Sequence, residues 1–155
     1  MLIPVVVFAC ILFFLFYSFP TAIDLDYPAI EYRNDEPGQA EVTRIWIKGT
    51  LRRPLFRDGS FHGSIVIDKY EFTRAFRLFD VHLSQWDDTV MGVLTYSPVQ
   101  DVLLPLRTLG PLWISGDFER LEIHHARGEN GSLPYILSAP ARTYEEALLN
   151  KQLME

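Results

Sequence analysis

The sequence predicts a mainly β domain, an antiparallel sandwich or a partly open barrel, with a short C-terminal helix and one N-terminal transmembrane helix. Three observations predict this fold class. Residues 1–20 contain no charged side chain, apolar and polar residues alternate in several runs after residue 42, and a helix-capping sequence begins at Thr143. The 155 residues leave enough chain for one domain beyond the apolar segment.

Residues 1–20, MLIPVVVFACILFFLFYSFP, are apolar almost throughout. An α-helix needs about 20 such residues to cross about 30 Å of hydrocarbon, so we expect an uncleaved signal anchor. Two alternatives stay open: a cleaved signal peptide, and a lipoprotein signal with Cys10 as the lipidated residue. A cleaved signal is disfavoured because no Lys or Arg precedes Arg33.

The segment that follows, residues 21–41, is predicted to be an acidic linker, since Pro28 and Pro37 interrupt any long element. Because this flank lacks a basic cluster, we expect a single-pass protein of the cell membrane whose C-terminal domain is extracytoplasmic. The opposite topology stays open, because the α-amino group is the only positive charge before the span.

All of the charged side chains lie beyond residue 20, and that part of the chain carries the net charge of −6. An acidic domain of this kind argues against nucleic-acid binding. The single cysteine, Cys10, lies in the apolar segment, so the domain has neither a disulfide nor a cysteine metal site.

The predicted domain, residues 42–155, begins with an alternating strand over 42–52. Ile45 and Ile47 point to one face and Arg44 and Lys48 to the other. A second alternating run follows Asp58-Gly59, which is typical of a hairpin turn. This second run covers residues 61–68. Further strands are expected over residues 75–83, 89–96, 101–107, 111–116, 118–126 and 133–139, with a second hairpin tip at Asn130-Gly131.

A helix is expected over residues 143–154. Thr143 and Glu146 form a capping box, and good helix formers continue to Met154. Pro140 ends the preceding strand. We expect the helix to pack on the sheet or to close the end of a barrel.

One basic stretch is the candidate binding surface. Cations alternate with an indole along one strand face and continue past its end, and the predicted partner-binding residues are Arg44, Trp46, Lys48, Arg52, Arg53 and Arg57. Such a face suits an anionic partner. The alternative is a solvated face whose cations pair with acids of neighbouring strands or of the linker.

No catalytic, cofactor or metal site is predicted. Adjacent His124 and His125 point to opposite faces of a strand and so cannot hold one ion together. Asp87-Asp88 is most simply a loop, and Asn130-Gly131-Ser132 fits both a glycosylation sequon and a hairpin turn.

The expected function is that of a non-catalytic, membrane-anchored binding or assembly module that contacts another membrane or envelope component. A protein is the expected partner, with an anionic lipid or polymer as a further candidate. Three alternatives stay open: a small-ligand or lipid carrier with an aromatic-lined pocket, an accessory subunit of a larger membrane complex, and a hydrolase acting on an envelope polymer.

Overall fold

The computed structural model describes residues 2–17, 19–34, 37–54, 57–86, 89–99, 105–125 and 135–154. Within these ranges the helices are α1 (Leu2–Phe16), α2 (Phe72–Ala75) and α3 (Tyr144–Met154), with a short 3-10 turn at Pro37–Gln39. The strands are β1 (Pro20–Tyr32), β2 (Glu41–Arg52), β3 (Gly59–Ile67), β4 (Phe76–Leu78), β5 (Val81–Trp86), β6 (Thr89–Pro98), β7 (Arg107–Ser115), β8 (Arg120–His125) and β9 (Tyr135–Ala139).

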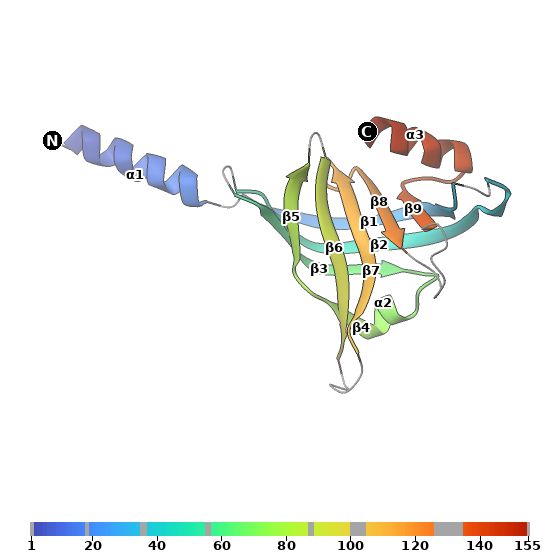
Figure 1. The fold of residues 1–155 in the computed structure, drawn as a ribbon. Helices are drawn as coiled ribbons and strands as arrows, with labels where there is room; N and C mark the ends of the chain where they lie inside the picture. The colour runs from blue at the N-terminus through green and yellow to red at the C-terminus, as the bar shows by residue number, and fades with distance from the viewer. Residues whose placement is uncertain are drawn as a thin grey trace.

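The strands close into an antiparallel barrel. Their order is β6-β5-β3-β2-β1-β9-β8-β7, and β7 pairs with β6 again. Because β4 and β5 pair with opposite ends of β6, they act as one interrupted strand, and eight strands complete the ring in the described chain. Figure 1 shows β1, β2 and β3 crossing behind β5 to β8. The mainly β prediction is confirmed. The ring of strand pairings is closed, in place of the predicted sandwich or partly open barrel, although β1 pairs with β9 only over Ile30–Tyr32.

Strand β1 corrects the predicted linker over residues 21–41. Most of its first half alternates, with Ile23 buried and Leu25 and Tyr27 packed against the core, while Asp24 is exposed. It pairs with β2 along its length, from Pro20 opposite Arg52 to Glu31 opposite Glu41. The linker prediction is wrong here because Asp24 and Asp26 occupy the outer face of a half-buried strand, and because Pro28 lies within the strand without ending it.

The predicted strand over 75–83 is also divided. Residues 72–75 form the single turn α2, and the backbone leaves the strand conformation at Phe79-Asp80 between β4 and β5. The predicted strands over 101–107 and 111–116 correspond to one strand, β7, which begins at Arg107; residues 101–104 and the hairpin at Asn130-Gly131 lie outside the described residues.

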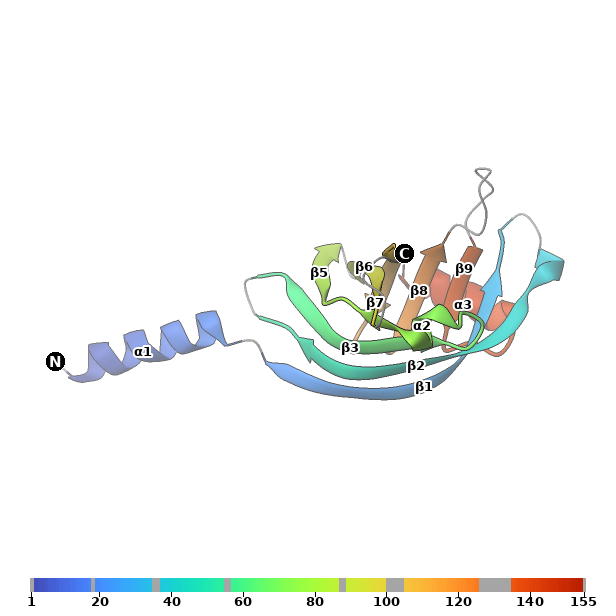
Figure 2. The same ribbon diagram turned by 90° about the horizontal axis from the view of Figure 1, so that it is seen from below.

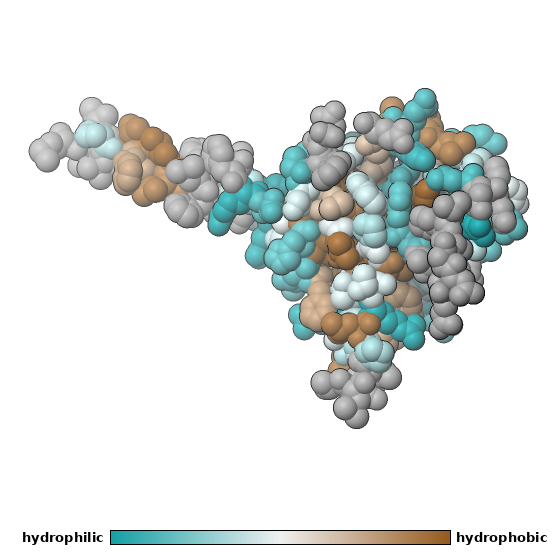
Figure 3. Space-filling view, viewed as in Figure 1, coloured by the Kyte–Doolittle hydropathy of each residue, from teal (hydrophilic) through white to brown (hydrophobic). Residues whose placement is uncertain are grey.

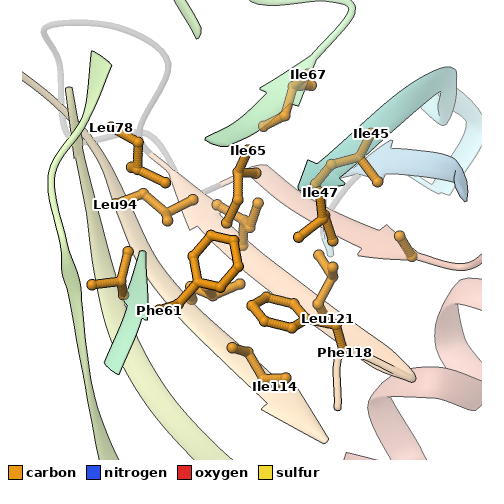
Figure 4. Packing of buried hydrophobic residues seen from close by; sticks show 14 of the residues in the cluster. Ile45, Ile47, Phe61, Ile65, Ile67, Leu78, Leu94, Ile114, Phe118 and Leu121 are labelled. Carbon is orange, nitrogen blue, oxygen red and sulfur yellow. The ribbon is translucent and has the colours of Figure 1, made fainter. Parts of the chain in front are cut away.

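Apolar side chains fill the interior of the barrel. Phe61 from β3 and Phe118 from the β7–β8 turn are fully buried, and their rings meet edge to face at a centroid distance of 5.0 Å. Figure 4 shows them between the two crossing layers, surrounded by Ile47, Leu94 and Ile114 among others. The barrel is therefore a packed core.

Two glycines face each other where β2 and β3 approach most closely. Gly49 pairs with Gly63 in the β2–β3 register. A Cβ on Gly63 would collide with the carbonyl oxygen of Lys48 and would lie 2.6 Å from the Cα of Gly49. Both are backbone atoms of a paired strand, so they have little freedom to move away.

Gly63→Ala is expected to lower the free energy of unfolding by about 2 kcal/mol, because the strands have to separate to admit the methyl group. Gly38→Ala is the matched control, because a Cβ on Gly38 meets nothing within 4 Å. Urea titrations followed by circular dichroism measure both. Equal midpoints for the two variants contradict the close approach of the strands.

Helix α3 confirms the predicted C-terminal helix. The hydroxyl of Thr143 accepts a hydrogen bond from Glu146 N at 3.3 Å, as the capping box predicts. The helix covers the outer face of β1 and β9: Ala147 is buried there, and the Tyr144 ring meets Tyr32 edge to face at 5.2 Å. Asn150 Nδ2 donates to Pro140 O at 2.8 Å.

Helix α1 is shorter than the transmembrane helix predicted over residues 1–20. It spans 15 residues, about 22 Å at the α-helical rise, and ends at Phe16 because Phe19 leaves the helical conformation with φ 28° and Pro20 opens β1. No helix within the described residues combines the length and hydrophobicity needed to cross a membrane. Figure 3 shows a hydrophobic surface on the described side chains of α1.

Candidate binding surface

The six predicted binding residues fall into two groups. Arg44, Trp46 and Lys48 lie on the outer face of β2, because the alternate positions are taken by the buried Ile45 and Ile47. We call these three residues the outer face of β2. The other three lie at the end of the β2–β3 hairpin.

Acids of β1 neutralise the outer face of β2. Arg44 Nε lies 2.9 Å from Asp26 Oδ1, and Lys48 Nζ lies 3.3 Å from Asp24 Oδ2. Both pairs are well exposed, so each contributes about 0–1 kcal/mol to stability. The alternative that these cations pair with acids of the presumed linker is confirmed for Arg44 and Lys48.

The indole of this face is also engaged. The Arg74 guanidinium lies 5.8 Å from the centre of the Trp46 ring, within the range of a cation–π contact. Arg74 in turn pairs with Asp68 Oδ1 at 3.2 Å. The outer face of β2 therefore presents mixed charges around one aromatic ring.

Arg52, Arg53 and Arg57 lie at the end of the barrel nearest to α1, and we call them the basic end. Arg52 pairs in register with Pro20, the first residue of β1 after α1. Figure 2 shows the end of β2 and the start of β3 on the same side of the barrel as the start of β1 and helix α1. Arg53 donates to Gly116 O and pairs with Asp117 at 3.1 Å. Arg53 and Arg57 line a shallow surface depression together with Asp58, Gln85 and Val90, among other residues.

A buried polar network closes the opposite end, and the sequence did not reveal it. Glu31 is 1% exposed and His125 is 4% exposed. His125 Nε2 lies 2.8 Å from Glu31 Oε1 and 2.9 Å from the Tyr70 hydroxyl. Tyr70 and Lys69 also donate to the Glu31 carboxylate, and Lys69 reaches Glu41 as well.

Hydrogen bonding decides the charge state of Glu31. Burial alone raises its pKa, but the hydrogen bonds from His125, Lys69 and Tyr70 outweigh burial and lower the pKa to about 2. The network joins β1, β8 and the turn after β3, with Glu41 on β2 attached through Lys69. Since its acid and imidazole are both enclosed, we assign it a structural role. The sequence pattern that could have identified Glu31 is the alternation of β1, because Glu31 follows Ile23 at an even spacing and so points to the same inner face.

The two adjacent histidines point to opposite faces, as strand geometry predicts. His125 points into the network, whereas the His124 ring lies 4.4 Å from that of Trp113. In the part of the chain that the structure describes, no group of three or more potential metal ligands converges. Asp87-Asp88 and Asn130-Gly131-Ser132 lie outside the described residues.

No protein-family model, curated protein or solved structure matches this chain.

Proposed function

We propose that this protein is a non-catalytic, membrane-associated binding or assembly module. Helix α1 inserts into a bilayer, and the barrel is held at the membrane surface to contact another membrane or envelope component. The observation that supports this most strongly is a juxtaposition. An apolar helix with exposed side chains leads directly into the basic end of a barrel that is otherwise packed.

Helix α1 presents apolar side chains on all of its sides. Its sequence, LIPVVVFACILFFLF, has no polar face. More than half of the surface of Val6, Phe8 and Phe13 is exposed. Apolar surface left in water is unfavourable by about 25 cal/mol per Å², so these side chains favour a lipid environment. Tyr17 and Phe19 follow at the position where aromatic residues meet the headgroups.

The basic end adds electrostatic attraction to an anionic membrane surface. Insertion of α1 brings Arg52 close to the bilayer surface, because Arg52 lies opposite Pro20 in the β1–β2 register. Arginines at an anionic surface contribute about 1 kcal/mol each to attraction. The outer face of β2 is left to a protein partner, whose acids would compete with Asp24 and Asp26 for the same cations. Because the partner's acids would have to displace Asp24 and Asp26, these cations would contribute more to the choice of partner than to the affinity for it.

The packed interior favours a binding module over a carrier. The aromatic side chains considered as a pocket lining include Phe61 and Phe118, which pack on each other inside the barrel. Their space is occupied by protein, so the barrel resembles a small filled barrel more than one that holds a ligand.

Vesicle flotation of the full chain tests the proposal. The chain is expected to float with phosphatidylcholine vesicles through α1, and to float more completely when phosphatidylglycerol is included. Added salt should remove only that increment. Replacing Phe8 and Phe13 by glutamate should abolish flotation with both kinds of vesicle. A folded wild-type chain that stays at the bottom of the gradient with both would contradict the proposal.

The basic end has its own variant and control. Arg52→Glu with Arg57→Glu is expected to remove the increment due to phosphatidylglycerol and to leave flotation with phosphatidylcholine unchanged. Arg77→Glu with Arg142→Glu makes the same change in net charge at exposed positions elsewhere. An equal loss in both double variants would show that net charge alone, and not the basic end, attracts the anionic surface.

A further inference from the structure

We propose that the open edge of β1, residues 20–27, is a docking site for an extended polypeptide segment that alternates basic and apolar side chains. The segment would add to the sheet as a further antiparallel or parallel strand. This inference is independent of membrane association and concerns a second surface, separate from the one that the outer face of β2 offers to an acidic partner.

Among the strands that the structure describes, β1 has a partner on only one side along most of its length. It pairs with β2 from Pro20 to Glu31, but with β9 only over Ile30–Tyr32. Ala141 N donates to Pro28 O at 2.9 Å and closes the next position. Between Pro20 and Tyr27 no described strand lies on that edge. Figure 1 shows β9 reaching β1 only at the end far from α1.

The backbone groups at this edge follow from strand geometry. Successive residues of a strand direct their N–H and C=O groups to opposite edges. The Pro28 carbonyl is directed to the β9 side, so Ala22, Asp24 and Asp26 direct their backbone groups to the same side. These groups form an exposed row of donors and acceptors, which is the template that strand addition uses.

Charge determines which strand fits. Asp24 and Asp26 flank the edge on the outer face, and their side chains are 76% and 47% exposed even though each is ion-paired. Outward lysine or arginine side chains would complement this edge, whereas an acidic strand would be repelled.

The inner side of the edge favours apolar residues. Leu25 and Tyr27 are only partly buried, although they pack against the core. Apolar side chains of an added strand would continue this layer and cover them. The segment that fits therefore alternates cations facing outward with apolar residues facing inward.

Strand β2 already provides an example of such a partner. It presents Arg44 and Lys48 outward and Ile45 and Ile47 inward, and it occupies the opposite edge of β1. A second copy of β1 fits less well. Antiparallel self-pairing centred on Leu25 would place Asp24 opposite Asp26, and like charges directly opposite one another are unfavourable.

The test uses the full nitrogen-15-labelled chain in zwitterionic detergent micelles, titrated with a short peptide that alternates lysine and valine. Binding is expected to slow hydrogen exchange at the amides of Ala22, Asp24 and Asp26. A matched peptide that alternates glutamate and valine is expected to bind about tenfold more weakly or less. Equal affinity for the two peptides overturns the proposed chemistry.

Two variants separate strand addition from general charge attraction. Ala22→Pro removes one N–H at the open edge and leaves the β2 pairing intact, so it should weaken binding about tenfold while the rest of the amide spectrum is retained. Asp24→Asn with Asp26→Asn should weaken binding severalfold. Asp68→Asn, which removes the exposed partner of Arg74, is the matched control and should have no effect.

Hydrogen exchange at the edge amides distinguishes docking at the β1 edge from binding elsewhere. Slowed exchange at the three edge amides, lost in Ala22→Pro, supports docking at the β1 edge. Full affinity in Ala22→Pro, or binding that shifts resonances without slowing exchange at these amides, overturns it.

Discussion

Truncation of Phe61 to alanine is expected to lower the free energy of unfolding by about 4 kcal/mol. The Phe61 side chain is fully buried between the crossing layers, and its ring contacts Phe118 edge to face. Removal of the ring loses the free energy gained by transferring it from water into the core. It also leaves a cavity that strands β2 and β3 cannot close, since they already approach each other at Gly49 and Gly63. Urea titration of the full chain in mild detergent measures the loss.

Phe79→Ala is the matched control for this experiment. The same side chain is removed, but Phe79 is 49% exposed and lies outside the core, between β4 and β5. Its truncation should change the free energy of unfolding by less than about 1 kcal/mol. If Phe61→Ala and Phe79→Ala unfold at the same urea concentration, the interior is not packed as described.

Loss of the Glu31 carboxylate is expected to have a comparable effect. Glu31→Ala should lower the free energy of unfolding at neutral pH by about 3–5 kcal/mol, because it leaves Lys69 and His125 without their enclosed anionic partner. Glu31→Gln should cost less, since the amide oxygen still accepts a hydrogen bond. Glu145→Gln, at an exposed site on α3, should be neutral.

The same carboxylate predicts an acid-dependent loss of stability. The pKa of Glu31 is lowered from 4.5 to about 2 in the folded chain. Because the pKa is lower in the folded chain, the ionised carboxylate stabilises the folded state fully at pH values above the unfolded-state pKa of 4.5. This stabilisation is lost as the pH falls from about 4.5 towards 2. The shift corresponds to about 3 kcal/mol. Urea midpoints of the wild type should therefore fall across this interval more steeply than those of Glu31→Gln; parallel curves would show that the network does not hold the charge.

The elements with the clearest local signals were predicted from the sequence. The alternation of Ile45 and Ile47 with Arg44 and Lys48 identified β2 and its two faces, and the capping box at Thr143 identified α3. Both depend on residues close in the chain. The closure of the barrel depends on the pairing of β6 with β7 and of β1 with β9. Strand neighbours are set by tertiary packing, so alternation predicted strands without their order.

The six predicted binding residues lie in two separate groups along β2 and the β2–β3 hairpin. The acids that pair with two of them, Asp24 and Asp26, came from a segment predicted as a linker. The Glu31 network was missed for the same reason. Its other members, Lys69, Tyr70 and His125, are far from Glu31 in sequence and meet only when the barrel closes.

Insertion of α1 into a bilayer is the central claim, and Cys10 allows a direct measurement. It is the only cysteine of the chain, lies in α1 and is exposed, so a thiol-reactive, polarity-sensitive fluorophore reports on this helix alone. With phosphatidylcholine vesicles, the emission is expected to shift to shorter wavelength and to be quenched by acyl-chain-linked quenchers. An emission that stays at its aqueous position, quenched only by water-soluble iodide, would contradict membrane association through α1.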